Sequence, residues 1–389
     1  MARLGDVCSI YAGTGFPIQY QGNSEGQYPF YKVGDISRNA TAGNKILSLC
    51  DNYIDFDVVK AIKGTVIPAG TVVFAKIGEA IKLNRRAITS CECLIDNNAM
   101  GIRPHVQHVL LDYFFHFICN VRMETLAEAT TVPSIKKSII EKIEIPVPTL
   151  KEQQRIATEL NHVDNLLSLR KQQLAKLDEL VKARFVEMFG DTGKQVLLTD
   201  YVWFQEGPGV RSVDFTDEGT ILLTGSNIND NTISFGYKSD RHISNELASG
   251  KYAHFMCDKD DILVVSSAID PEKFDKKVVV VGVDKKYCLN TGIIRFKPNK
   301  QYLTLGYFRE FLKTDYFKHQ VSSEMRGIAQ MHFGPSHLKQ MTILLPDSIE
   351  RQVEFEAFVQ QIDKSKLSVQ QSIDQLETLK KSLMQKYFG

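Results

Sequence analysis

The chain has 389 residues, of which 43% are hydrophobic and 24% charged, a composition typical of globular protein with room for two or three domains. Its formal net charge of +1 is low for a protein that binds DNA alone, so basic residues must cluster locally or a partner must share the phosphate contacts. The apolar runs are too short to cross a bilayer, and the start has no signal-peptide core. Seven scattered cysteines form no Cys-x-x-Cys pair, which excludes a zinc ribbon and favours the cytoplasm.

The first body, residues 1–150, alternates β-branched and aromatic stretches with turn residues. This pattern predicts many short strands and a helix near residues 111–128. Residues 191–348 repeat the order and end in a helix near residues 305–320. We therefore predict an α+β fold with two strand-rich bodies in tandem.

Each body is followed by a segment that predicts one long helix, residues 151–190 and 349–389. Most of each segment lacks Gly and Pro, and apolar residues recur at the spacings of a heptad pattern. So narrow a stripe needs a partner, and we expect the two helices to pair. The alternative is that each helix lies on its own body. The expected stripe consists of Leu160, Val163, Leu167, Leu174, Leu177 and Val181 in the first helix and Phe358, Ile362, Val369, Leu376, Leu379 and Leu383 in the second.

The chain repeats its own landmarks at a period near half its length, which indicates two similar domains in tandem. If the copies pair about a pseudo-twofold axis, their helices run antiparallel and form a spacer between the bodies. The repeated segments are Leu4-Gly-Asp and Leu198-Thr-Asp, Gly13-Thr-Gly15 and Gly207-Pro-Gly209, Pro148-Thr-Leu-Lys-Glu-Gln-Gln154 and Pro346-Asp-Ser-Ile-Glu-Arg-Gln352, and Phe189-Gly190 and Phe388-Gly389.

Motifs of catalysis are absent from the sequence. It contains neither the Pro-Pro-aromatic motif of amino-methyltransferases nor a phosphate-binding loop. Because the Gly-x-Gly segment occurs in both repeats, it predicts a turn near the domain entrance rather than a methyl-donor loop. A metal-dependent nuclease centred on Glu272 and Asp275 is a weaker alternative than a solvated charged loop. Trp203, the only tryptophan, is expected to pack in the core.

One stretch resembles a family signature. Residues 130–156, with Pro133, Ile-Pro146-Val-Pro148 and Glu152-Gln-Gln154, resemble the junction between a target-recognition domain and a spacer helix in the specificity subunits of Type I restriction–modification systems. The resemblance implies a non-catalytic subunit whose two bodies each read one half of a bipartite, asymmetric site in double-stranded DNA. The paired helices would set the gap and dock two methyltransferase subunits, which restriction subunits join. S-adenosylmethionine, ATP and Mg²⁺ would belong to those partners.

Base reading in the major groove requires side chains such as Arg, Lys, Asn or Gln. The alternative to DNA reading is a coiled-coil scaffold that only recruits a partner. Basic residues in turn-rich segments are the candidate DNA contacts: Lys76, Lys82, Arg85 and Arg86 in the first body, and Arg211, Arg241, Lys273 and Arg326 in the second.

Overall fold

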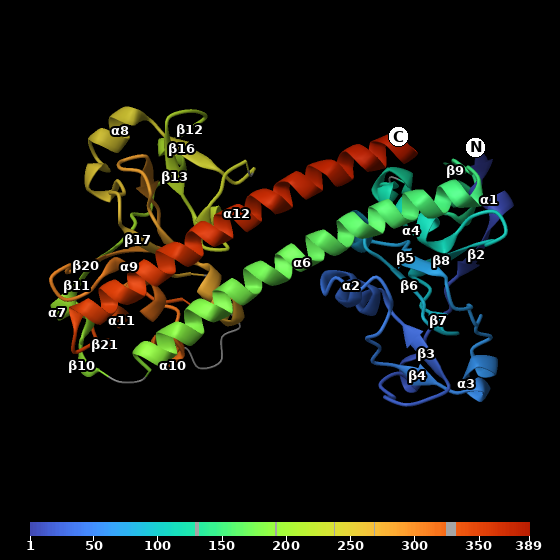
Figure 1. The fold of residues 1–389 in the computed structure, drawn as a ribbon, viewed down its shortest axis with the longest axis horizontal. Helices are drawn as coiled ribbons and strands as arrows, with labels where there is room; N and C mark the ends of the chain where they lie inside the picture. Colours follow the sequence, from blue (N-terminus) through green and yellow to red (C-terminus); the bar gives the residue numbers. More distant parts are fainter. Residues whose placement is uncertain (129–131, 191–192, 237, 268, 324–331) are drawn as a thin grey trace. The chain divides into compact units, whose positions relative to one another are not determined.

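The computed structural model describes residues 1–128, 132–190, 193–236, 238–267, 269–323 and 332–389. It forms two compact units, one comprising Met1–Gln173 with Val369–Gly389 and the other Leu174–Ser368. Each unit therefore contains one strand-rich body together with a part of each long helix (Figure 1). Within the described part of the chain, no helix is long and apolar enough to span a membrane.

The body of unit 1 contains two main sheets. The larger is antiparallel with the order β2-β8-β5-β6, and the smaller has the order β4-β3-β7 with β3 and β7 parallel. All four residues of β5 are buried, as an unbroken apolar run predicts. The strands are β1 (Ala2–Arg3), β2 (Cys8–Ala12), β3 (Tyr28–Tyr31), β4 (Tyr53–Ile54), β5 (Val72–Ala75), β6 (Arg86–Ile88), β7 (Leu94–Ile95), β8 (Ala99–Pro104) and β9 (Glu144–Ile145).

Short helices connect these strands. One of them, α4, lies within the range expected for a helix but ends earlier, because the Val121 backbone is extended. The helices of this body are α1 (Leu4–Val7), η1 (Ile18–Tyr20), α2 (Val33–Thr41), α3 (Phe56–Ala61), η2 (Glu79–Leu83), α4 (Leu111–Asn120), η3 (Met123–Leu126) and α5 (Lys137–Ile140).

The body of unit 2 repeats this plan. Its antiparallel sheet has the order β11-β20-β17-β18, and its second sheet, also four-stranded, has the order β12-β16-β13-β19 with β13 and β19 parallel. The strands are β10 (Lys194–Leu197), β11 (Val202–Glu206), β12 (Phe215–Thr216), β13 (Thr220–Leu223), β14 (Ile228–Asn229), β15 (Thr232–Ile233), β16 (Arg241–Ile243), β17 (Ile262–Val265), β18 (Val278–Val280), β19 (Tyr287–Leu289), β20 (Ile293–Pro298) and β21 (Thr342–Leu345).

The helices of the second body also follow the order of the first. A helix expected near residues 305–320 is present but is divided into α9 and α10, because the α-helix stops at Leu312. The helices are α7 (Leu198–Tyr201), η4 (Ser212–Asp214), η5 (Gly225–Asn227), α8 (Asn245–Ser249), η6 (Ala253–Phe255), η7 (Pro271–Lys276), α9 (Leu305–Phe311), α10 (Asp315–Ser323) and α11 (Pro335–Leu338).

The two long helices are α6 (Leu150–Met188) and α12 (Ile349–Phe388). Within unit 1, the Tyr387 hydroxyl donates to Glu159 at 2.7 Å, and Lys380 forms an ion pair with Asp164 at 2.6 Å. Residue numbers rise along α6 as they fall along α12, so the helices are antiparallel in this unit, as predicted.

The same direction holds within unit 2. Lys366 contacts Asp178 at 2.5 Å, and Arg184 contacts Glu354 at 2.9 Å. These exposed pairs contribute little free energy individually, so apolar burial must supply most of the stability of the helix pair.

Most of the expected apolar stripe is buried or half-buried, and Leu379, at 47% exposed, is the exception. The pattern also missed inward aromatic residues, because the helices pack on the bodies as well as on each other. In unit 2, Phe185 and Phe189 lie against Tyr307 of α9 and Phe355 of α12. The pairing prediction and the body-packing alternative are therefore both partly correct.

A buried glutamine joins each long helix to the body before it. In unit 1, Gln153 accepts from the Leu110 amide at 2.9 Å and donates to the carbonyls of His108 and Pro148. In unit 2, Gln352 accepts from the Thr304 amide at 3.0 Å. The sequence comparison matched Gln352 with exposed Gln154, and this register is one residue off, because burial pairs Gln352 with Gln153.

Candidate nucleic-acid interface

The loops that carry most candidate DNA contacts leave one end of the four-stranded antiparallel sheet in each body. In unit 1, Ala12 at the end of β2 pairs with Met100, and Ala75 at the end of β5 pairs with neighbouring Ala99. The segments that follow Ala12 and Ala75 therefore start side by side. They carry η1, η2 and the basic residues between positions 76 and 86.

Unit 2 has the equivalent arrangement. Glu206 ends β11 opposite Ile294, and Val265 ends β17 opposite Ile293. The segments that follow lead to η4 and η7. Tertiary structure thus gathers sequence-distant loops at the same sheet end in both bodies.

The Gly-x-Gly segments directly follow β2 and β11, at the start of these loops. Only the first glycine of each segment is sterically required. A Cβ atom on Gly13 would lie 1.8 Å from the Asp96 carbonyl oxygen, and one on Gly207 would lie 2.2 Å from that of Asn290. The second glycine of each segment faces open space. The close approach of two backbones explains why the first glycine recurs. The predicted turn is not confirmed at residues 13–15, where Thr14 instead forms a bridge with Asp96.

Three candidates in the first body lie on the segment between β5 and β6. Lys82 is exposed and forms an ion pair with Glu79 at 2.7 Å. Lys76 and Arg85 are half-buried. Their common segment can offer positive charge, although Lys82 would have to exchange its carboxylate partner for a phosphate.

Arg86 does not share this role. Its side chain is 5% exposed and donates to the carbonyls of Asn84 and Val121, at 2.6 Å each. Burial lowers the pKa of its guanidinium. Because these contacts tie Arg86 to two backbone segments, we withdraw it from the candidate DNA contacts and assign it to folding.

In the second body, Arg211 and Arg241 lie near one another in the fold. Arg211 is exposed at the start of η4, and the Arg241 guanidinium lies 5.9 Å from the ring of Phe215, which follows η4. Lys273, in η7, forms an ion pair with Asp270 at 3.1 Å. Arg326 lies outside the described residues.

The alternative metal site is not supported by the environment of Asp275. Its carboxylate contacts Lys182 at 2.5 Å and Lys318 at 2.6 Å. Burial alone would raise the pKa of this carboxyl, but hydrogen bonds from the two lysines outweigh that effect and lower it. Among the described side chains, which do not include that of Glu272, no group of three metal-binding residues occurs. Asp275 instead ties η7 to α6 and α10.

The expectation for Trp203 is wrong. This side chain is 50% exposed, and its ring lies 5.2 Å from the Arg295 guanidinium and 5.7 Å from the Lys297 ammonium. The sequence also missed Ile18 and Val213, which are almost fully exposed. An aliphatic residue a few positions after each Gly-x-Gly segment was the available signal.

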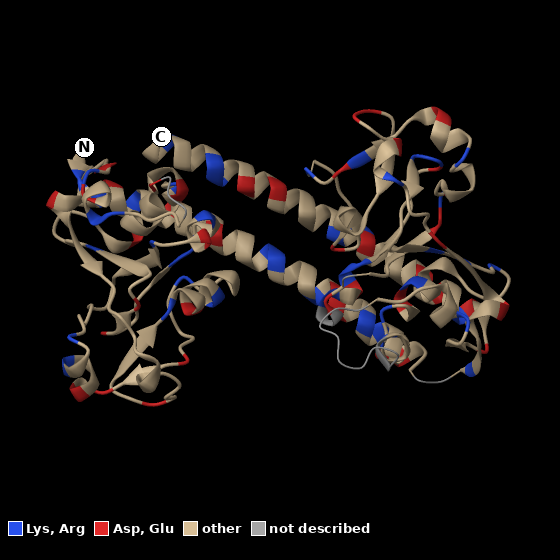
Figure 2. Cartoon of the chain, turned by 180° about the vertical axis from the view of Figure 1, so that it is seen from behind, with Lys and Arg blue, Asp and Glu red and all other residues tan. Residues whose placement is uncertain are grey.

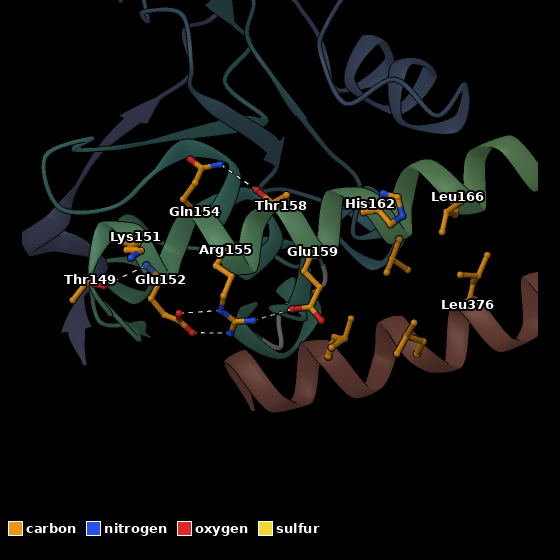
Figure 3. A pocket seen from close by; sticks show the side chains of 13 residues that line it. Thr149, Lys151, Glu152, Gln154, Arg155, Thr158, Glu159, His162, Leu166 and Leu376 are labelled. Atoms are coloured by element: carbon orange, nitrogen blue, oxygen red, sulfur yellow. Dashed lines mark hydrogen bonds and ion pairs between the residues drawn. The ribbon is translucent and has the colours of Figure 1, made fainter.

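A second candidate surface is a groove of about 870 Å³ within unit 1, between the start of α6 and the end of α12 (Figure 3). Its apolar lining is Val163, Leu166, Leu376, Leu379 and Leu383. At one end, Arg155 lies between Glu152 and Glu159, at 2.7 and 3.3 Å. The groove combines apolar surface with an ordered charged rim, a combination typical of protein-binding sites.

Charge is mixed on both units rather than segregated. Figure 2 shows Lys and Arg interspersed with Asp and Glu along α6, α12 and the two bodies. The near-neutral total therefore reflects local mixing of both signs. Phosphate contacts from this chain have to come from a few loop residues, with the remainder supplied by partners.

A family model and a curated relative both place the chain in the same family. The family model described as "Type I restriction modification DNA specificity domain" matches residues 1–179 and 198–378. The chain is 24% identical to the Type I restriction enzyme MjaVIII specificity subunit of Methanocaldococcus jannaschii, over 99% of this chain and 90% of that protein.

Two solved structures have a similar fold over the whole chain. The Type I restriction–modification S subunit from M. genitalium has a TM-score of 0.54 at 14% identity, covering 100% of this chain and 95% of that one. A second structure, from a study of complex assembly in the Type I restriction–modification system, has a TM-score of 0.53 at 17% identity. The match covers 100% of this chain and 96% of that one.

Proposed function

The chain belongs to the family of Type I restriction–modification DNA specificity domains, and on that premise we propose that each of its two bodies reads one half of a bipartite, asymmetric DNA site. Its role is that of a non-catalytic DNA sequence-specificity subunit. The coiled-coil scaffold without DNA reading and the nuclease are therefore replaced by this role. The family needs no cofactor of its own. We assign S-adenosylmethionine, ATP and Mg²⁺ to the partner subunits and expect a cytoplasmic complex.

The observation that carries the proposal is the duplication of the body with its loops. The order of the antiparallel sheet and the positions of the loops that leave it recur in both units, while the side chains on those loops differ. Half-sites on one face of DNA lie about 34 Å apart centre to centre. A continuous helix of 39 residues is about 58 Å long, so α6 is long enough to set such a gap.

Genome-wide mapping of methylated adenine tests this proposal, after co-expression of the chain with its methyltransferase subunit. We expect a sequence divided into two parts by unspecified bases. Replacement of residues 1–150 by the body of another family member should change one part only. Methylation of an undivided sequence, or a swap that changes both parts, would contradict independent reading by the two bodies.

The spacer has its own test. Insertion of seven residues that continue the heptad pattern near Lys171, in the part of α6 that faces Glu377 at 3.7 Å, should change the gap or abolish recognition. An unchanged gap between the two parts would refute the role of the helices in spacing.

We further propose that α6 and α12 dock two methyltransferase subunits and that the groove of unit 1 belongs to this contact. Exposed Leu379, which faces the groove, supports the assignment because it leaves apolar surface uncovered. Leu379→Asp should weaken co-purification with the methyltransferase subunit at least tenfold. Leu49→Asp is the matched control, since Leu49 is 46% exposed on the body. Equal retention of the partner by both variants would exclude this groove.

A further inference from the structure

The two most exposed large apolar side chains in the described part of the chain lie in corresponding single-turn helices of the repeat. Ile18 is 86% exposed and Val213 is 85% exposed. Each follows the Gly-x-Gly segment of its body and lies in a single-turn helix, Ile18 as the first residue of η1 and Val213 as the second residue of η4. One exposed aliphatic residue is ordinary on a protein surface. Two in corresponding helices of a duplicated fold indicate a contact that both bodies make.

The backbone beneath Ile18 is fixed by hydrogen bonds and ring packing. The Tyr20 amide donates to the Pro17 carbonyl at 3.1 Å, and the Gln21 side chain donates to the Phe16 carbonyl at 2.8 Å. The Phe16 ring stacks on fully buried Phe30, with centroids 3.8 Å apart. Ile18 is therefore presented on a firm base, as preorganised binding requires.

The backbone beneath Val213 is fixed by different residues. The Asp214 amide donates to the Arg211 carbonyl at 2.9 Å. The Asp214 carboxylate accepts from the Tyr252 hydroxyl at 2.7 Å and from Lys251 at 2.9 Å. The two turns thus each hold an exposed aliphatic residue, through unrelated supporting side chains.

The polar neighbours of these residues are of the types that pair with base edges. Exposed Gln19 follows Ile18, and exposed Arg211 lies two residues before Val213. In the major groove, a Gln amide can pair with adenine and an Arg guanidinium with guanine, while an apolar side chain contacts the thymine methyl group.

Each turn also has a positive charge beside it, suited to a phosphate. The Lys32 ammonium lies 5.5 Å from the Phe16 ring, and the Arg241 guanidinium lies 5.9 Å from the Phe215 ring. A turn with an aliphatic tip, a base-reading neighbour and a nearby cation has the parts needed to enter a DNA groove.

We propose that η1 and η4 enter the major groove of the two half-sites and that Ile18 and Val213 each pack on the C5-methyl group of a thymine. The inference rests on the proposed reading of one half-site by each body. It adds a specificity role for two apolar residues that a search for polar base contacts overlooks.

The test uses the complete methyltransferase complex and a duplex carrying its mapped methylation sequence. Each thymine of the duplex is replaced in turn by uracil, which lacks only the methyl group, and Kd is measured. For the wild-type complex, one replacement in each half-site should weaken binding about fourfold, the effect of one buried methyl group. Ile18→Ala should abolish that difference in one half-site only, and Val213→Ala in the other only.

Two exposed valines provide matched controls. Val106 is 60% exposed near the start of β2, the opposite end from the strand terminus that leads to Ile18. Val283 is 51% exposed before β19, at the opposite sheet edge from β12. Val106→Ala and Val283→Ala should retain both uracil effects.

The outcomes separate this inference from the proposed function. If the wild-type complex methylates no divided sequence, the proposed function fails. If it methylates one but Ile18→Ala weakens thymine and uracil duplexes equally, the methyl contact is refuted while half-site reading stands. Loss of the methyltransferase subunit from Ile18→Ala would instead identify a protein contact and would also overturn the inference.

Discussion

Replacement of Gln153 by Met should destabilise unit 1 although the two side chains have similar length and shape. Gln153 is fully buried and makes three hydrogen bonds, to the Leu110 amide and to the carbonyls of His108 and Pro148. A buried amide left without an acceptor costs about 1–3 kcal/mol, and each lost carbonyl contact adds up to about 1 kcal/mol. We expect a total loss of about 2–4 kcal/mol in the free energy of unfolding.

Urea denaturation followed by far-ultraviolet circular dichroism measures this loss. With a slope of about 3 kcal/mol per molar urea, near the upper end for small proteins, the midpoint should fall by about 1 M. Gln154→Met is the control, because Gln154 is exposed and donates only to the Thr158 hydroxyl at 3.3 Å. Equal midpoints for the two variants would refute the assignment of Gln153 as the buried junction residue.

The equivalent change in unit 2 has its own probe. Gln352 is also fully buried and contacts the Thr304 amide and the Tyr302 carbonyl. Trp203 is the only tryptophan and lies in this unit. Gln352→Met should therefore lower the midpoint of the Trp203 fluorescence transition more than Gln153→Met does. The reverse order would contradict the equivalent structural roles of the two glutamines in their units.

Three further changes test the packing. Gly13→Ala should lower the free energy of unfolding by about 1–3 kcal/mol because its Cβ would meet a carbonyl at 1.8 Å, whereas Gly15→Ala should leave it nearly unchanged, as urea denaturation can show. Phe189→Ala should cost about 3–5 kcal/mol, since the ring is 4% exposed, and a cost below 1 kcal/mol by the same assay would contradict its core position. His116 provides a pH test: burial lowers its pKa below the ordinary value of about 6.5, so protonation favours the unfolded chain and stability falls as pH drops below that value. His116→Gln should flatten this fall between about pH 7 and 5, measured from unfolding midpoints.

The sequence by itself determined the duplicated plan and the long helices. Matching landmarks such as Gly13 and Gly207 reveal two copies, and a long segment without Gly or Pro has few alternatives to a helix. These signals are local or periodic, so they do not depend on how distant segments meet. The family resemblance rested on the same kind of local signal, the spacing of prolines and Glu-Gln at the junction.

Tertiary structure alone decided which side chains are buried and which face outward. Arg86 is of a residue type that often contacts DNA, but it is buried and donates to the Val121 carbonyl. Trp203 is of a type that often packs in a core, but it is half exposed. By its type, Ile18 is an ordinary apolar residue, yet it is exposed on a turn that hydrogen bonds hold in place. A residue type limits the contacts a side chain can make, but the register of strands far apart in sequence determines which of those contacts it meets.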